Sequence, residues 1–125
     1  MDDFTIALPN APSTAGSARR IVAERVGGHP RRSELLVCVS ELVTNAMIHA
    51  RCAPTVRIII RRARVRVEVA DDSPALPVMA PADVMAKGGR GLRIVDHLSL
   101  DWGTTPRRHR PGKIVWFEFE GTQAA

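Results

Sequence analysis

Apolar residues recur along the chain with two periods, which predict strands and helices in a mixed order. Strands are predicted at residues 4–8, 55–61, 65–70, 100–104 and 113–120, and apolar and polar residues alternate in several of them. Apolar residues follow helical spacing at residues 14–27, 32–50 and 91–98. They are so dense in 32–50 that this helix should be largely buried.

Proline and glycine mark several of the expected boundaries. Pro9 ends the first strand, which we place at an edge of the sheet because proline donates no ladder hydrogen bond. Ser13 or Thr14 is expected to cap the first helix, and Gly27 with Gly28 to end it. Proline, glycine and hydroxyl residues therefore mark the boundaries of the first strand and the first helix.

A proline-rich segment, residues 73–89, interrupts the regular pattern. It contains Pro74, Pro77 and Pro81 and ends in glycines, so we predict a mobile loop with one short helical turn at residues 82–85. The other elements predict an α+β sandwich: a mixed, mainly antiparallel sheet with three helices on one face. A cavity between helices and sheet, covered by the loop, is the natural ligand site.

Length and charge narrow the classes of function. A chain of 125 residues fits one domain spanning residues 1–125. The net charge of +5 comes almost wholly from scattered arginines and would suit a polyphosphate, an acidic protein surface or nucleic acid. Few aromatic residues are interleaved with the arginines to stack bases, so direct DNA or RNA binding is not expected. An Arg-rich solvated surface is the simpler interpretation.

The sequence gives no sign of a membrane or of an oxidising compartment. No stretch is long and apolar enough to span a bilayer, and the N-terminus lacks the features of a secretory signal. Cys38 and Cys52 lack the spacing of a zinc site and are expected to be reduced. We therefore expect a cytoplasmic protein.

Glu41 and Asn45 lie one turn apart on the most apolar predicted helix and would project from the same face. A carboxylate can accept a proton, and a carboxamide oxygen is a suitable ligand for Mg²⁺. An uncompensated carboxylate on a buried helix is costly, so the pair favours a ligand site over two incidental polar residues. His49, one turn further, is interpreted as a structural or phosphate-side hydrogen-bonding residue, not as a metal ligand.

Asp71 is a second candidate because it ends an expected strand. A carboxylate there could accept a hydrogen bond from an exocyclic amine, the group that distinguishes adenine from guanine. Asp72 competes for this role, and the Asp-Ser-Pro sequence that follows allows either residue to be only a turn residue.

A glycine-rich segment supplies the third candidate. Gly88, Gly89 and Gly91 flank Arg90 at the expected start of the third helix. Glycines there let backbone amides approach phosphate oxygens, and the helix N-terminus adds a partial positive charge. A flexible hinge is the alternative for this segment alone. The three segments together, in this order, are far more specific for a Mg²⁺-associated nucleotide.

These motifs resemble the ATP-binding boxes of the GHKL superfamily, and most closely those of the small bacterial anti-sigma-factor serine kinases. The matching segments cover nearly the whole chain: residues 41–50, 67–71, 89–96, 98–103 and 112–117. The resemblance implies the Bergerat ATP-binding sandwich, with ATP and Mg²⁺ as cofactors.

The resemblance also implies roles for individual residues. Glu41 would be the catalytic base, Asn45 the Mg²⁺ ligand and Asp71 the adenine reader. The phosphates would lie against the glycine-rich segment, Gly88, Gly89, Arg90, Gly91 and Leu92. Such kinases bind a sigma factor and phosphorylate a serine of an anti-anti-sigma (STAS) protein, usually as homodimers, so these are the expected partners.

The chain departs from the family pattern at the second box. Ser73 and Ala75 stand where glycines are usual, and Pro74 stiffens the base of the loop. Ile114 falls where a threonine near the adenine is common. We still assign Ser73, Ala75 and Ile114 to the nucleotide site, but their side chains restrict a close approach of the nucleotide.

Three functions therefore remain open on sequence grounds. The first is an ATP-dependent serine kinase that also sequesters a sigma factor, favoured by Glu41 and Asn45. The second is a non-catalytic partner-switching module with weak or no nucleotide binding, favoured by Ser73, Ala75 and Ile114. The third is a basic nucleic-acid binder, which would show a steep salt dependence.

Overall fold

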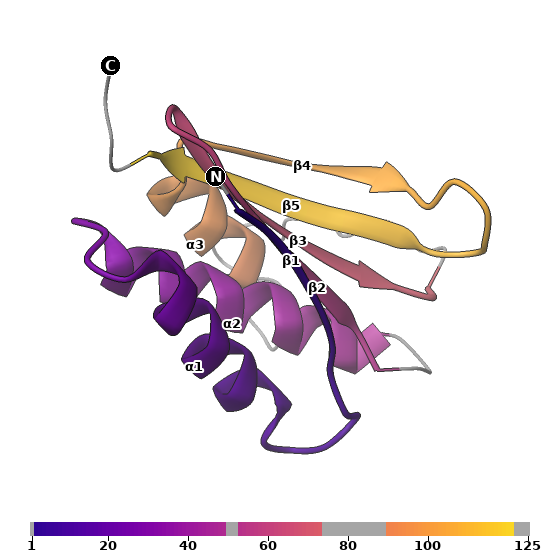
Figure 1. Cartoon of the computed structure of the whole chain (residues 1–125). Helices are drawn as coiled ribbons and strands as arrows, with labels where there is room; N and C mark the ends of the chain where they lie inside the picture. The colour runs from indigo at the N-terminus through magenta and orange to yellow at the C-terminus, as the bar shows by residue number, and fades with distance from the viewer. Residues whose placement is uncertain (1, 50–52, 74–89, 122–125) are drawn as a thin grey trace.

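Five strands form one sheet in the computed structural model, which describes residues 2–49, 53–73 and 90–121 (Figure 1). The strands are β1 (Asp2–Ala7), β2 (Thr55–Ile60), β3 (Arg64–Asp71), β4 (Asp101–Pro106) and β5 (Lys113–Glu120). Their order across the sheet is β1-β2-β3-β5-β4, and each neighbouring pair is antiparallel. The predicted edge position of the first strand is confirmed.

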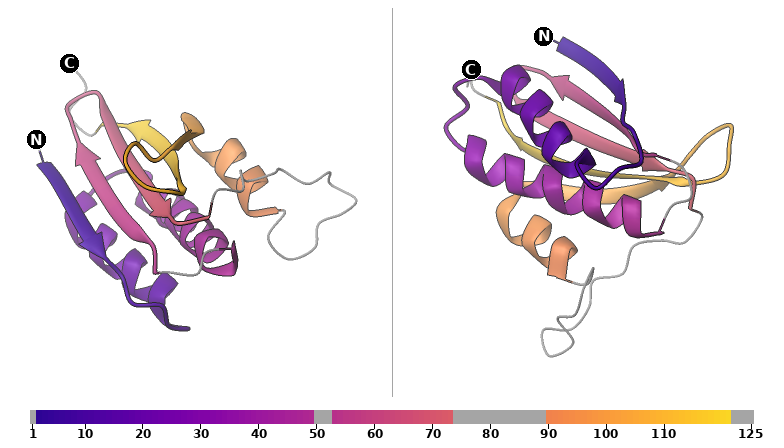
Figure 2. Two further views of the ribbon diagram at one scale, coloured as in Figure 1. Left: turned by 90° about the vertical axis from the view of Figure 1, so that its right-hand side faces the viewer. Right: turned by 90° about the horizontal axis from the view of Figure 1, so that it is seen from below.

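Three helices cover one face of this sheet (Figure 2). They are α1 (Thr14–Val26), α2 (Arg32–His49) and α3 (Arg90–Leu98), and α2 packs between the other two. The predicted α+β sandwich is confirmed, although no parallel pair occurs among the described strands. The loop and the helical turn predicted at 73–89 lie outside the described residues beyond Ser73. Within the described ranges, no helix is long and apolar enough to cross a bilayer.

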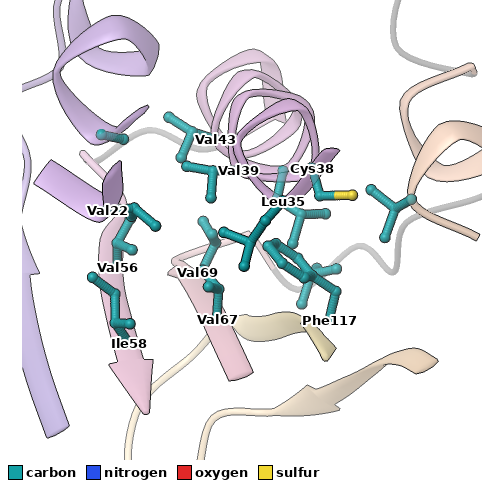
Figure 3. Close-up of a cluster of buried hydrophobic side chains, with 14 of the residues drawn as sticks. Val22, Leu35, Cys38, Val39, Val43, Val56, Ile58, Val67, Val69 and Phe117 are labelled. Carbon is teal, nitrogen blue, oxygen red and sulfur yellow. The ribbon is translucent and has the colours of Figure 1, made fainter. Parts of the chain in front are cut away.

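The core lies between α2 and the central strands, where the apolar face of the helix packs on the apolar face of the sheet. Leu35 and Val39 on the inner side of α2 point toward Val67 and Val69 of β3 and toward Phe117 of β5 (Figure 3). All five side chains are at most 1% exposed. Burying such a side chain contributes about 1.5–3 kcal/mol, so this contact holds the two layers together.

The other face of the sheet is charged. Arg57 of β2 pairs with Asp3 of β1 and with Glu68 of β3, and Arg66 joins Glu68 to Glu118 of β5. The Arg57 guanidinium lowers the pKa of the Asp3 carboxyl through this hydrogen bond. A continuous row of ion pairs therefore crosses four strands, and the strand alternation keeps it away from the core.

The first helix begins differently from the prediction. Ser13 occupies the cap position but makes no side-chain cap hydrogen bond. The fully buried Thr14 hydroxyl instead donates to the Pro9 carbonyl and accepts the Ala11 N–H at 3.1 Å. The Thr14 side chain thus stabilises the turn that precedes the helix. Gly27 ends the helix as predicted, with a φ of 54°.

Burial of Cys38 gives a first testable prediction. Desolvation raises the pKa of its thiol to about 12. Such a thiol holds roughly a thousandfold less thiolate at pH 8 than a free cysteine of pKa ~8.5, and thiolate is the reactive form. In a Cys52→Ser variant, Cys38 should therefore react with a disulfide reagent only after addition of denaturant. Labelling without denaturant at the rate of a free thiol would contradict the buried position.

Candidate nucleotide site

Glu41 and Asn45 form the centre of the candidate site because α3 begins directly against them. Both side chains are half-buried on α2. A Cβ atom added to Gly91 would lie 2.7 Å from Glu41 Oε2 and 3.5 Å from Asn45 Nδ2. A side chain at Gly91 would force the Glu41 carboxylate to move, so the first turn of α3 lies directly against it. The structure therefore brings together two of the three sequence motifs.

The apolar side of α3 explains why the helix starts at this place. Leu92 and Val95 are at most 1% exposed and belong to the core. At the other end of the helix, Asp96 accepts a 2.8 Å hydrogen bond from Trp102 Nε1 of β4. Leu92 was predicted to lie close to the phosphates, but its side chain packs in the core. Only its backbone N–H, in the first turn of α3, could then serve the predicted phosphate contact.

The start of α3 is also favourable to negative charge. Glu41 lies beside the first turn of this nine-residue helix, where unpaired backbone N–H groups give a partial positive charge. Phosphate oxygens are bound well by the same groups. The arrangement can therefore place a proton acceptor next to a bound polyanion.

Asp71 lies at the end of β3 with its side chain turned inward, and it is 2% exposed. Its Oδ1 accepts the Ser73 N–H at 2.9 Å. Asp72 is only partly buried, so the choice of Asp71 as the inward carboxylate agrees with the structure. The end of β3 and the last turn of α2 lie at the same end of the sandwich (Figures 1 and 2).

Lys113 is the site residue that sequence reasoning missed. Its Nζ donates to Asp71 Oδ1 at 3.0 Å, and its side chain is only 5% exposed. Lys113 precedes Val115, Phe117 and Phe119 with period two, and all four side chains face inward. Extending that alternation back by one step would have found it.

The same alternation corrects the prediction for Ile114. Ile114 pairs in register with Ala70 and Thr105, next to Lys113 but on the opposite face of the sheet. It therefore does not line the space between helices and sheet. Lys113 occupies the inward place that the prediction gave to Ile114.

The turn between β4 and β5 fixes Asp71 and Lys113. Gly112 has a φ of 122°, and an added Cβ would lie 2.0 Å from the Asp71 carbonyl oxygen, so only glycine fits. Arg107 donates to that same carbonyl oxygen from Nη1 at 3.3 Å and to the Gly112 carbonyl from its backbone N–H at 3.1 Å. The end of β3 is thus held by a tight basic turn.

Several predicted site residues cannot be placed. Ala75, Gly88 and Gly89 lie outside the described residues, and the side chains of His49 and Arg90 are likewise outside the description. Among the residues described, no group of three or more His, Cys, Asp or Glu could enclose a metal ion. Mg²⁺ bound to a nucleotide needs only one or two protein ligands, so the Asn45 carboxamide fits that requirement.

Comparison with known proteins decides the family. A profile of the histidine kinase-like ATPase domain matches residues 7–119. The chain belongs to the histidine kinase-like ATPase domain family. A search of the curated proteins finds no match.

A solved structure shares the fold of this ATPase-like domain. It is a histidine kinase domain from the Erythrobacter litoralis EL346 blue-light activated histidine kinase, with a TM-score of 0.55 and 22% sequence identity. The match covers 89% of the present chain and 61% of the other, so this ATPase-like domain corresponds to only part of the longer protein. This likeness supports the fold, and the family implies ATP binding.

The contact between Gly91 and Glu41 gives a second prediction. In this ATPase-like domain, Gly91→Ala should be about 0.5–1.5 kcal/mol less favourable than a glycine-to-alanine change elsewhere in a helix, because the new methyl group forces the Glu41 carboxylate out of its position. The same change in a Glu41→Ala background should lose this cost. Urea unfolding of the four proteins in this double-mutant cycle measures the coupling.

Gly16→Ala is the matched control, since Gly16 also lies in the first turn of a helix and its new Cβ would meet only the Arg19 guanidinium, at 3.6 Å. This substitution should stabilise the domain by about 0.5–1 kcal/mol. A Gly91→Ala variant that behaves like this control would show that the Glu41 carboxylate is not held against Gly91.

The buried ion pair gives a third prediction. Lys113→Met alone should destabilise the domain by about 3–5 kcal/mol, because it leaves the Asp71 carboxylate buried without its partner. The double variant Asp71→Leu, Lys113→Met should recover most of this loss. Chemical denaturation measures both, with Glu34→Gln at the exposed Arg31 pair as a control of little effect. Additive costs in the double variant would argue against a direct pair.

Proposed function

We propose that this ATPase-like domain is an ATP-binding transcriptional regulator, an anti-sigma-factor-like serine kinase. It would sequester a sigma factor and phosphorylate a serine of an anti-anti-sigma (STAS) protein, with a homodimer as the working form. The family supports ATP binding, and the finer assignment rests on the motifs around Glu41. Its location would be the cytoplasm, where such partners act.

One observation carries the kinase proposal: the Glu41 carboxylate stands directly against the first turn of α3, with its Oε2 at 2.7 Å from a Cβ placed on Gly91. That turn offers backbone N–H groups to phosphate oxygens. A seryl hydroxyl of the partner could then attack the γ-phosphorus of ATP, its proton passing to Glu41 as ADP leaves.

Asn45 supports the same proposal from the next turn of α2. Its carboxamide lies beside Glu41 and near Gly91, where an oxygen ligand could hold the metal ion that accompanies ATP. Mg²⁺ would supply charge neutralisation at the phosphates. Asp71, at the same end of the sandwich, would accept the adenine amine.

The alternative is a partner-switching module of the same fold that has weak or no nucleotide binding. Two observations favour it. Ser73 and Ala75 replace glycines in the second box, and the Asp71 carboxylate already forms an ion pair with Lys113. In that case the surfaces for the sigma factor and the STAS protein would act without phosphate transfer.

Phosphate transfer tests the kinase proposal, and it gives a fourth prediction. The protein is incubated with labelled ATP, Mg²⁺ and a purified STAS protein from the same organism. Glu41→Gln should lower transfer by about 10²- to 10⁴-fold, the usual contribution of a general base. Glu24→Gln, on the exposed side of α1, is the matched control and should leave the rate unchanged.

Two outcomes would reject the kinase. Transfer that is undiminished in Glu41→Gln would remove the role of the base, and no transfer by the wild-type protein would remove the activity. Calorimetry with ATP and ADP then tests the alternative, since submicromolar affinity for Mg²⁺-ATP would count against a module without a nucleotide.

A further inference from the structure

We infer that Lys113 is a base-reading residue, whose ammonium donates a hydrogen bond to the adenine ring nitrogen beside the exocyclic amine that Asp71 reads. The inference rests on the proposed nucleotide site and adds a specificity-determining residue to it. Lys113 is distinct from the residues assigned to metal binding, phosphate binding and proton transfer.

The hydrogen-bonding characters of Lys113 and Asp71 are opposite and adjacent. The ammonium is a pure donor and the carboxylate a pure acceptor, and their contact atoms lie 3.0 Å apart. Adenine presents the complementary pattern on one edge: an amine donor next to N1, an unprotonated ring acceptor. A base that meets Asp71 with its amine therefore brings N1 toward the ammonium of Lys113.

Both groups can form more hydrogen bonds than the one that joins them. The ammonium has three N–H donors, of which Asp71 uses one. Among the described residues, Lys113 and the Ser73 N–H both contact Oδ1 of Asp71, and together they orient the carboxylate. A buried ammonium gains from a further acceptor, which a bound base can supply.

The place of Lys113 is fixed by the backbone. The strand register pairs it with Asp71, and the alternation of β5 directs its side chain to the helix side of the sheet. Gly112 and Arg107 clamp the adjoining turn to the end of β3. Lys113 therefore stays next to Asp71 at the inner end of the sandwich.

A chemical substitution in the ligand tests this contact directly. Calorimetry with Mg²⁺ compares ADP with 1-deaza-ADP, in which a C–H replaces N1. Wild type should bind 1-deaza-ADP about 10- to 100-fold more weakly, since a charge-assisted hydrogen bond is lost. A control ligand, 7-deaza-ADP, changes the opposite edge of the base and should bind like ADP.

Two variants then assign the loss to Lys113. In Lys113→Met the preference for ADP over 1-deaza-ADP should disappear, whatever the absolute affinities become. Lys113→Gln keeps a neutral donor and should retain part of the preference. If Lys113→Met does not fold, the ligand comparison on wild type and Lys113→Gln still decides.

Three outcomes would overturn the inference. Equal binding of ADP and 1-deaza-ADP by wild type would show that N1 receives no hydrogen bond. An equal increase in the affinity for both ligands in Lys113→Met would show that Lys113 merely blocks Asp71. No binding of ATP or ADP by wild type would reject the nucleotide site itself, a failure of the proposed function that is distinct from the first two.

Discussion

The alternation of side chains along β3 and β5 is the constraint on which the rest of the structure depends. It directs Val67, Val69 and Phe117 toward α2, and these residues build the core. The same alternation places Asp71 inside, one step after Val69 of β3, and Lys113 inside, one step before Val115 of β5. A polar pair at the end of an apolar surface is thus a direct result of strand geometry, and so is the row of ion pairs on the opposite face.

Most of the fold could be predicted from the sequence because apolar periodicity and proline positions determine it locally. Errors arose where a contact depends on how the chain turns or on how two strands pair. The Thr14 hydroxyl donates a hydrogen bond to the Pro9 carbonyl and does not act as a simple helix cap. This contact depends on how the chain turns after β1. The prediction assigned Ile114 to the site instead of Lys113 because it used the position in the motif and did not consider which face of the strand each side chain occupies. The register with Asp71, 42 residues away, cannot be read from local pattern.

The candidate site was predictable to the extent that its residues share one helix. Glu41 and Asn45 follow from a spacing of four residues on α2. Their approach to Gly91 depends instead on the burial of Leu92 and Val95, which draws α3 onto α2. Glu41 and the first turn of α3 are therefore coupled through packing. A regulator that works by partner exchange could use that coupling, since a shift of α3 would alter the surroundings of Glu41.

The two tryptophans lie on opposite faces of the sheet, and the chain contains no tyrosine. Trp102 is bonded to Asp96 on α3, whereas Trp116 packs beneath the Arg66 guanidinium and over Gly103. Intrinsic fluorescence of the protein thus arises from one indole that senses the placement of α3 and one that does not. Replacing Trp116 with phenylalanine would leave a single native fluorophore, hydrogen-bonded to the helix that begins at the candidate nucleotide site, as an optical reporter that requires no added dye.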